Sequence, residues 1–102
     1  MNEEEILILL RNPQTRRRGF DTMVRLYSEP LYWKIRHIVL THEDADDILQ
    51  NTFLKVWANI GSFENRSKLS TWIYRIAINE SLDFLRRKRN ETRLYSTDME
   101  HV

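Results

Sequence analysis

The sequence predicts an all-α fold, a compact bundle of about four helices. Apolar residues recur at spacings of three and four, the period of a helix with one buried face. Only two Gly and two Pro occur in 102 residues, too few for the many turns of an all-β domain. A chain of this length can enclose one hydrophobic core and not two.

The first two helices are expected over 3–11 and 16–40. An Asn-Pro pair ends the first one, and residues 1–15 should form a short N-terminal helix or arm. Pro30 lies inside the second helix and should kink or split it near Ser28–Glu29. The residues of the second helix that share one stripe, and so should line the core, are Phe20, Met23, Val24, Tyr27, Leu31, Ile35 and Ile38.

The third helix should open at Thr41, which has capping-box spacing to Asp44, and Gly61 should be its C-cap. Acidic residues in its first turn suit the positive end of a helix dipole. Its expected core stripe consists of Ala45, Leu49, Phe53, Val56, Trp57 and Ile60.

The fourth helix should begin with a cap at Ser70 or a near neighbour and continue to about Asn90, followed by a frayed tail over 93–102. It carries two apolar stripes on roughly opposite sides, so it should lie between neighbouring elements. One stripe is Ile73, Ile76, Ala77 and Phe84, and the other is Tyr74, Ile78, Leu82 and Leu85.

Charge is unevenly distributed along the chain, although the net charge is only +1. Between Lys55 and Arg93 there are nine bases and four acids, whereas Glu43 to Leu54 holds four acids and no base. The excess of cations in the second half suggests a polyanionic partner. Cations that merely stabilise helix C-termini would give the same count, so charge alone leaves both interpretations open.

The composition argues against several classes of protein. Cysteine is absent, which rules out disulfides and Cys-based zinc sites and suggests a reducing compartment. No apolar run could span a membrane, and the acidic start does not resemble a signal peptide, so a cytoplasmic location is expected. A Gly-rich phosphate loop and a nucleophile motif are both missing, and neither catalysis nor a bound cofactor is expected.

One face of the third helix is polar around a single leucine. Glu43, Asp47, Gln50, Asn51 and Leu54 share this face at about 100° per residue. A solvated surface is the simplest explanation. A metal site built on Glu43 and Asp47 would need further oxygen ligands, and no other helix offers a matching carboxylate pair. The third possibility is a docking face, because an acidic rim around an apolar anchor suits a basic partner helix.

A mixed strip lies between the two apolar stripes of the fourth helix and presents Trp72, Arg75, Asn79 and Arg86. Aromatic and guanidinium planes stack on bases, amides read base edges and cations hold phosphates, so the strip suits unpaired nucleic acid. The preceding connector, FENRSKLS, adds polar side chains beside Trp72. An ordinary solvated surface is the competing explanation for both.

Two stretches, DADDILQNTFLKVW and FENRSKLSTWIYRIAINESLDFLRRKR, resemble conserved region 2 of extracytoplasmic-function (ECF) sigma factors in the bacterial sigma-70 family. The upstream stretch FDTMVRLYSEPLYWKIRHIV resembles the helix that opens that region. The resemblance implies a sigma-70 region 2-like domain over residues 16–92, which recognises promoters for an alternative sigma factor.

The resemblance also implies two interfaces and an inhibitor. The clamp helices of the RNA polymerase β′ subunit would bind Asp46, Asp47, Gln50, Asn51 and Leu54. The non-template strand of the −10 promoter element, with one base turned out into a loop pocket, would bind Phe63, Asn65, Arg66, Ser67, Lys68, Ser70, Thr71, Trp72, Arg75, Asn79 and Arg86. An anti-sigma factor is the expected inhibitory partner.

The chain departs from the family pattern at two points. Asn51 stands where the family commonly has an acid, so one charged contact to polymerase is expected to be missing. The helix-turn-helix that reads the −35 element has no counterpart in the sequence, so we expect an excised domain or natural fragment that binds polymerase but locates promoters poorly. The alternatives are a protein-interaction adaptor that binds no DNA, and an all-α metal-dependent hydrolase that uses Glu43 and Asp47.

Overall fold

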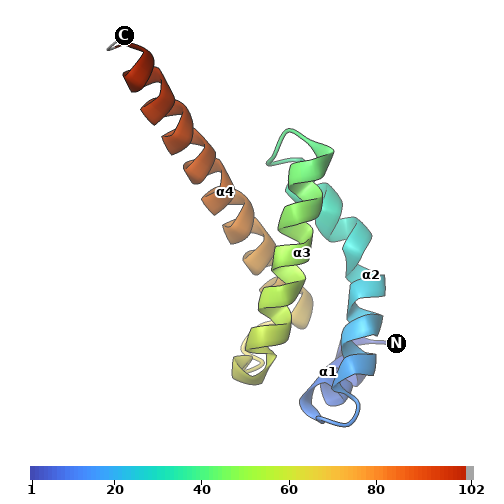
Figure 1. Ribbon diagram of the computed structural model, residues 1–102. Helices are drawn as coiled ribbons and strands as arrows, with labels where there is room; N and C mark the ends of the chain where they lie inside the picture. Colours follow the sequence, from blue (N-terminus) through green and yellow to red (C-terminus); the bar gives the residue numbers. More distant parts are fainter. Residues whose placement is uncertain (101–102) are drawn as a thin grey trace.

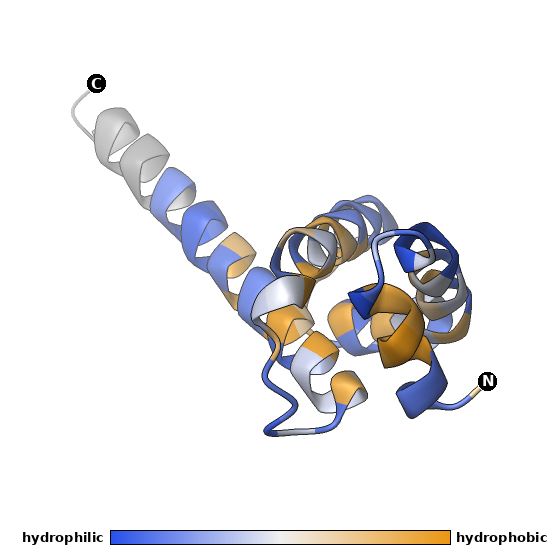
Figure 2. Cartoon of the chain, turned by 90° about the horizontal axis from the view of Figure 1, so that it is seen from below, coloured by the Kyte–Doolittle hydropathy of each residue, from blue (hydrophilic) through white to orange (hydrophobic). Residues whose placement is uncertain are grey.

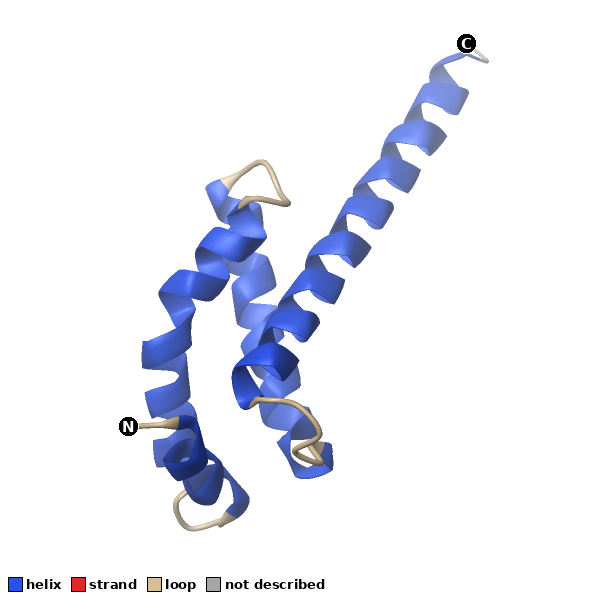
Figure 3. Ribbon diagram, turned by 180° about the vertical axis from the view of Figure 1, so that it is seen from behind, coloured by secondary structure: helices blue, strands red, loops and turns tan. Residues whose placement is uncertain are grey.

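The computed structural model describes the backbone of residues 1–100 and the side chains of residues 1–91. Within these limits, four α-helices follow one another (Figure 1). They are α1 (Glu3–Arg11), α2 (Arg16–Arg36), α3 (His42–Asn59) and α4 (Leu69–Glu100), with a 3-10 turn, η1 (Ile60–Ser62), after α3. The described backbone contains no strand (Figure 3), which confirms the all-α prediction.

α1 and α2 form a tight helical hairpin. Thr15 Oγ1 donates to the Leu9 carbonyl at 2.8 Å, and Arg16 Nε donates to the Leu10 carbonyl at 2.9 Å. These bonds satisfy carbonyls that the end of a helix leaves free. Gly19 permits the close approach, because a Cβ at this position would lie only 2.8 Å from Leu9 Cβ. The hairpin adds the buried side chains of α1 to the core of the domain.

α2 continues through Pro30 without a break, so it is not split. The ribbon changes direction along the helix, as a proline kink would produce (Figures 1 and 3). α2 ends at Arg36 rather than near Leu40. The Arg36 guanidinium donates to the Val39 carbonyl at 3.0 Å and holds the turn toward α3, in which Leu40 is exposed.

Of the two caps predicted for α3, the one at the N-terminus is confirmed and the one at the C-terminus is wrong. Thr41 caps the helix as predicted, because its Oγ1 accepts the Asp44 N–H at 3.1 Å. The prediction that Gly61 is the C-cap is wrong. α3 ends at Asn59, and Gly61 lies inside η1 without a positive φ. A glycine after a helix is favoured for its left-handed conformation, and Gly61 does not adopt it.

The core lies where the helices meet (Figure 2). The predicted stripe of α2 is buried or partly buried throughout. On α3 the stripe is rotated from the predicted position, since Trp57 is 41% exposed while Ile48 and Thr52 are buried. Trp57 packs at the rim against Phe20 of α2, with ring centroids 5.0 Å apart. The core face of α3 therefore turns toward α4, where Ile48 and Thr52 are covered.

Only one of the two predicted stripes of α4 is buried or partly buried along its whole length. Ile73 and Ala77 are completely buried. On the second stripe, Tyr74 and Ile78 are partly buried, but Leu82 and Leu85 are 39% and 37% exposed, so the prediction that neighbours cover both sides is wrong at Leu82 and Leu85. The reason is geometric: α4 extends beyond the ends of the other helices (Figure 1). None of the described helices is both long and apolar enough to cross a membrane.

The helix α4 also continues further than predicted, to Glu100 instead of about Asn90. The frayed tail expected over 93–102 falls on residues whose side chains lie outside the described part of the chain, and 101–102 lie outside the described backbone.

Candidate nucleic-acid and polymerase interfaces

The connector between η1 and α4 is an exposed loop with buried ends. Phe63 at one end is 8% exposed, and Leu69 at the other is completely buried. Between them Arg66 pairs with Glu64 at 2.9 Å, and both side chains are exposed. Asn65 has a φ of 60°, the only positive value among the described non-glycine residues, and asparagine is one of the few residue types that tolerate it. The connector therefore arches away from the core.

Trp72 lies at the base of this arch. Its ring centroid is 5.0 Å from that of Phe63, and the two planes are tilted by 39°. Phe63 is buried, so it lies behind the indole, whereas Trp72 packs against the core and is still partly exposed. The structure thus places Phe63 as a support for Trp72, and the accessible part of the indole is available to a ligand.

The predicted strip on α4 is on the surface. Thr71, Arg75, Asn79 and Arg86 are all exposed. Arg75 and Asn79 make no hydrogen bond or ion pair with another described side chain. Arg86 pairs with Asp83 at 2.9 Å, an exposed pair of the kind that contributes little to stability and that another anion can displace. The strip runs for about 21 Å along the helix from Trp72 to Arg86.

The beginning of α4 differs from the prediction. Ser70 is not a cap, because α4 starts at Leu69 and Trp72 N–H donates to the Lys68 carbonyl at 3.1 Å. Instead the Ser70 N–H donates to Oε1 of Glu3 at 3.0 Å. The backbone amide of Ser70 is therefore not available to a phosphate.

Glu3 also accepts a hydrogen bond from the Tyr27 hydroxyl at 3.2 Å. Burial would raise the pKa of Glu3, but the hydrogen bonds from Ser70 and Tyr27 outweigh it and lower the pKa. Burial, together with the Glu3 charge, raises the pKa of Tyr27 to about 12. Sequence reasoning missed this site. Its one signal was the acidic run at residues 3–5, and acidic residues are favourable in the first turn of any helix.

The polar face of α3 is a second candidate interface. Asp47, Gln50 and Asn51 are exposed, and Leu54 is 66% exposed in their midst. Asp46 lies at the edge of this face and contacts His42, with Nε2 and Oδ2 3.1 Å apart. The structure thus brings the five predicted polymerase-binding residues to one side of α3, and their role stays a prediction.

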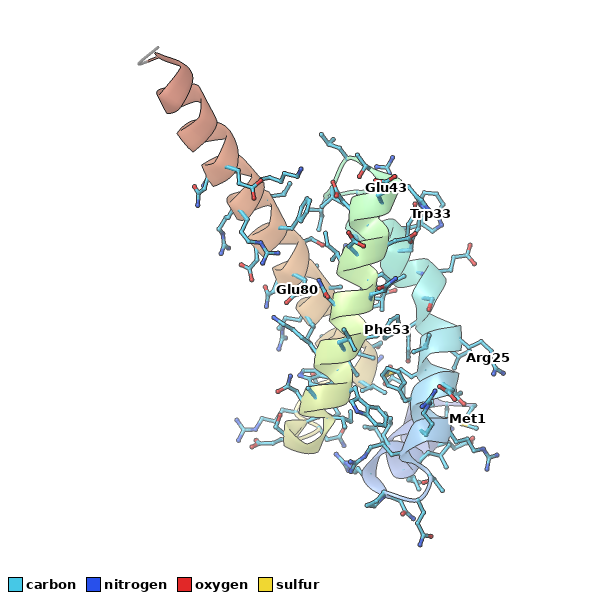
Figure 4. All side chains as sticks on the ribbon, in the orientation of Figure 1. Met1, Arg25, Trp33, Glu43, Phe53 and Glu80 are labelled. Carbon is cyan, nitrogen blue, oxygen red and sulfur yellow. The ribbon has the colours of Figure 1, made fainter. Side chains whose placement is uncertain are left out.

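A charged pair joins this helix to α4. The ammonium group of Lys55 contacts the carboxylate of Glu80, which is 8% exposed and lies on the side of α4 that faces α3 (Figure 4). A cavity of about 390 Å³ beside the pair is lined by residues of both helices, among them Asn51, Leu54 and Asp83. The two candidate interfaces therefore belong to helices that are fixed to each other.

An apolar groove lies on the other side of α4, against the C-terminal end of α2. It encloses about 590 Å³ and is lined by Trp33, Ile38, Tyr74 and Ile78, with Lys34 and His37 at the rim. Trp33 is 53% exposed and points away from the bundle (Figure 4). Leu82 and Leu85 extend the apolar surface along α4, next to Arg86 and Arg89. 

The carboxylates of α3 do not form a metal-binding cluster. Among the described residues, no group of three or more His, Cys, Asp or Glu side chains is close enough together to hold an ion. Glu43 and Asp47, the pair considered for a hydrolase, are exposed on one helix and have no third ligand within the described structure.

The chain is similar to known proteins over most of its length. The sequence model described as Sigma-70 region 2 matches residues 23–91. The ECF RNA polymerase sigma factor SigW of Bacillus subtilis is 35% identical over 71 residues, which are 70% of this chain and 38% of that protein. SigM of Mycobacterium tuberculosis, also an ECF RNA polymerase sigma factor, is 38% identical over 73 residues, 72% of this chain and 37% of its own length. The chain thus spans less than half the length of these relatives.

The fold matches a solved structure of the same kind of domain. An engineered region 2 of sigmaE, whose NMR structure was determined in complex with GTAAAA, superposes with a TM-score of 0.78 at 23% identity, over 89% of this chain and 93% of that one. The family match covers α3, the connector and the described part of α4 that carries both candidate interfaces, and it begins within α2. On this evidence the chain belongs to the sigma-70 region 2 family.

Proposed function

We propose that this domain recognises promoters for an alternative sigma factor of the ECF group. In this function it holds the non-template strand of the −10 element and docks on the clamp helices of the polymerase β′ subunit. The observation that carries the proposal is the surface at the start of α4. There a partly exposed indole, a guanidinium and an amide lie on one strip beside an arched polar connector.

The strip suits a single strand for physical reasons. Trp72 offers a ring on which a base can stack, and Phe63 behind it keeps the ring from turning inward. Arg75 and Asn79 have no partner among the described side chains, so they need not break a bond to contact a phosphate or a base edge. Turning a base out of a duplex costs a few kcal/mol, which such contacts can offset.

The connector adds a place for the turned-out base. Its exposed residues 64–66 and Lys68 arch beside Trp72, and Arg66 and Lys68 carry positive charge. The sigmaE domain similar to this one was solved in complex with GTAAAA, which supports an oligonucleotide ligand for this domain. A role at the promoter places the domain in the cytoplasm, where the bacterial chromosome lies, and requires no catalytic step.

The polar face of α3 is the proposed polymerase-binding surface. Leu54 supplies an apolar anchor, and Asp46 and Asp47 supply negative charge for a basic partner helix. Asn51 contributes hydrogen bonding without charge, so the attraction to a basic partner should be weaker than with an acid at this position.

The strand-binding proposal is tested by fluorescence anisotropy with a labelled single strand that contains GTAAAA. We expect Trp72→Ala to weaken binding about tenfold or more, because stacking on an aromatic ring contributes about 1–3 kcal/mol per base. Asn79→Ala should weaken it less. The matched control is Trp33→Ala, which removes an exposed tryptophan from α2. Equal affinities for wild type, Trp72→Ala and Asn79→Ala would contradict the proposal.

A protein-binding role is supported by the groove between α2 and α4. Its apolar lining and the ammonium group of Lys34 at its rim suit an amphipathic helix with acidic residues at its edges, which is the chemistry we propose for an anti-sigma factor. The alternative in which the domain is only an interaction adaptor would use the same groove. Trp33→Asp should then abolish capture of the inhibitor while leaving strand binding unchanged. If Trp72→Ala abolished that capture and Trp33→Asp did not, the inhibitor site would lie elsewhere.

A further inference from the structure

We propose that α1 acts as a brace for the strand-binding connector, with Glu3 and Arg11 holding its two ends. This inference rests on the proposed function, and it extends the interface to a helix outside the matched residues 23–91. Glu3 and Arg11 would be positioning residues, since neither needs to touch the strand.

The first contact is at the start of α4. The first amides of a helix have no partner within the helix, and a side-chain oxygen just before it usually binds one of them. Here the residue before α4 is Lys68, whose side chain has no acceptor. Glu3 takes this role from a position 67 residues away, by accepting the Ser70 N–H at 3.0 Å. Without Glu3, this helix start would have no protein cap.

The second contact is at the other end of the connector. Arg11 Nη2, in the last turn of α1, donates to the Phe63 carbonyl at 3.5 Å. Glu3 and Arg11 are thus the first and last residues of the same helix, and each holds one end of the connector. Tyr27 of α2 fixes the Glu3 carboxylate with a second hydrogen bond at 3.2 Å.

The spacing of the two contacts along α1 leaves room for an arched connector. Glu3 and Arg11 are about 12 Å apart along the axis of a rigid helix. A fully extended chain from Phe63 to Ser70 could span about 23 Å, so ends held by α1 leave slack. The connector takes up this slack with the left-handed conformation of Asn65. If either end were released, the arch could flatten and the exposed residues 64–66 would no longer be held beside Trp72.

The two neighbours of Glu3 show that the contact is specific to one carboxylate. Glu4 and Glu5 carry the same charge on the same turn, but both are exposed. The lowered pKa of Glu3 agrees with a carboxylate that is bound in its ionised form. All three glutamates therefore place negative charge at the N-terminal end of α1, but only Glu3 contacts the connector.

The test compares Glu3→Ala with Glu4→Ala, and Arg11→Ala with Arg18→Ala. Binding to the GTAAAA strand is measured at a temperature where circular dichroism shows each variant folded. We expect Glu3→Ala to weaken binding about tenfold, the size of a lost helix cap, and Arg11→Ala to weaken it severalfold. The controls should bind like wild type. Glu3→Gln keeps an acceptor oxygen, so its affinity for the strand should lie between those of wild type and Glu3→Ala. It also serves as the test variant if Glu3→Ala does not fold.

Hydrogen exchange gives a readout that does not depend on DNA. In Glu3→Ala, amides of residues 64–72 should exchange faster, while those in the middle of α2 and α3 keep their protection. Uniformly faster exchange would mean a general loss of stability and would overturn the brace. Equal strand affinity for Glu3→Ala and Glu4→Ala would also contradict the proposal that α1 braces the connector. If the wild-type domain bound no strand, the proposed function would fail, and the exchange data alone would decide whether α1 holds the connector.

Discussion

The carboxylate of Glu80 on α4 is almost fully buried, and the ammonium group that pairs with it, Lys55 on α3, is half-exposed. The pair is asymmetric. The buried charge of Glu80 is stabilised by Lys55, whereas the ammonium group of Lys55 can be solvated by water without Glu80. It also joins the helix with the proposed polymerase-binding face to the helix with the proposed strand-binding strip. Because of the asymmetry, loss of either partner should lower the free energy of unfolding by a different amount.

Loss of Lys55 should be more harmful than loss of Glu80. Lys55→Met leaves a buried carboxylate without a partner and should lower the free energy of unfolding by about 2 kcal/mol, less than for a fully buried pair because Lys55 is partly solvated. Glu80→Gln removes the buried charge and should cost about 1 kcal/mol. Urea denaturation measures both values. The control is Arg17→Met, which breaks an exposed pair with Asp21 and should cost less than about 0.5 kcal/mol. Equal losses for Lys55→Met and Glu80→Gln would contradict the assigned asymmetry.

Gly19→Ala should destabilise the domain, although alanine normally favours a helix over glycine. The new Cβ would lie 2.8 Å from Leu9 Cβ and 3.0 Å from the Leu10 nitrogen, so α1 and α2 would have to separate. Overpacking of this kind costs about 1–3 kcal/mol, more than the gain of about 1 kcal/mol in helix propensity. 

Gly61→Ala is the control for that change. No atom lies within 4 Å of a Cβ built at Gly61, and its φ is not positive, so the substitution should be neutral or slightly stabilising. The melting temperature should therefore fall for Gly19→Ala and stay unchanged or rise slightly for Gly61→Ala. A melting temperature that rises for Gly19→Ala would show that the helices are not in close contact.

The sequence predicted the elements of the fold well, because the signals for a helix lie within a few residues of each other. Thr41 and Asp44, which cap α3, are an example. The predicted core stripe of α3 was rotated about the helix axis relative to the observed one. Periodicity shows that a stripe exists, but it does not show which side of the helix packs against α4. The exposed Leu82 and Leu85 were missed for a related reason: an apolar stripe does not reveal whether a neighbouring helix is long enough to cover it.

The candidate site could be predicted only in part. The α4 strip was found because its residues share one helix face, and the structure places Trp72, Arg75 and Asn79 at the surface as expected. The contacts that hold the site were not found. Glu3 is 67 residues from Ser70, and no periodic pattern links residues so far apart. The burial of Phe63 behind Trp72 also depends on how the connector folds back, which a polar loop sequence does not specify.

Glu3 should make the stability of the domain depend on pH in the acidic range. Hydrogen bonds from Ser70 and Tyr27 lower its pKa below the ordinary value of 4.5, so the unfolded chain takes up the proton first as pH falls. The stabilisation is thus fully present above pH 4.5 and is lost as pH falls through the folded pKa. Denaturant titrations at pH 7, 5, 4 and 3 should show wild type more stable than Glu3→Gln at pH 7, with the difference shrinking toward pH 3. A constant difference would show that the Glu3 charge is not involved.

The polymerase-binding proposal makes its sharpest prediction at Leu54 and Asp47. Leu54 is 66% exposed, so Leu54→Ser should leave the free energy of unfolding within about 0.5 kcal/mol of wild type. Both Leu54→Ser and Asp47→Lys should nevertheless reduce polymerase capture severalfold, since the first removes the apolar anchor and the second places a cation against a basic partner helix. Strand binding, measured by anisotropy, should not change, because α3 does not contribute to the α4 strip.

Leu26→Ser, a change at an exposed leucine of α2, is the control for capture. If Leu54→Ser and Leu26→Ser were captured equally well, the polar face of α3 would not be the docking surface.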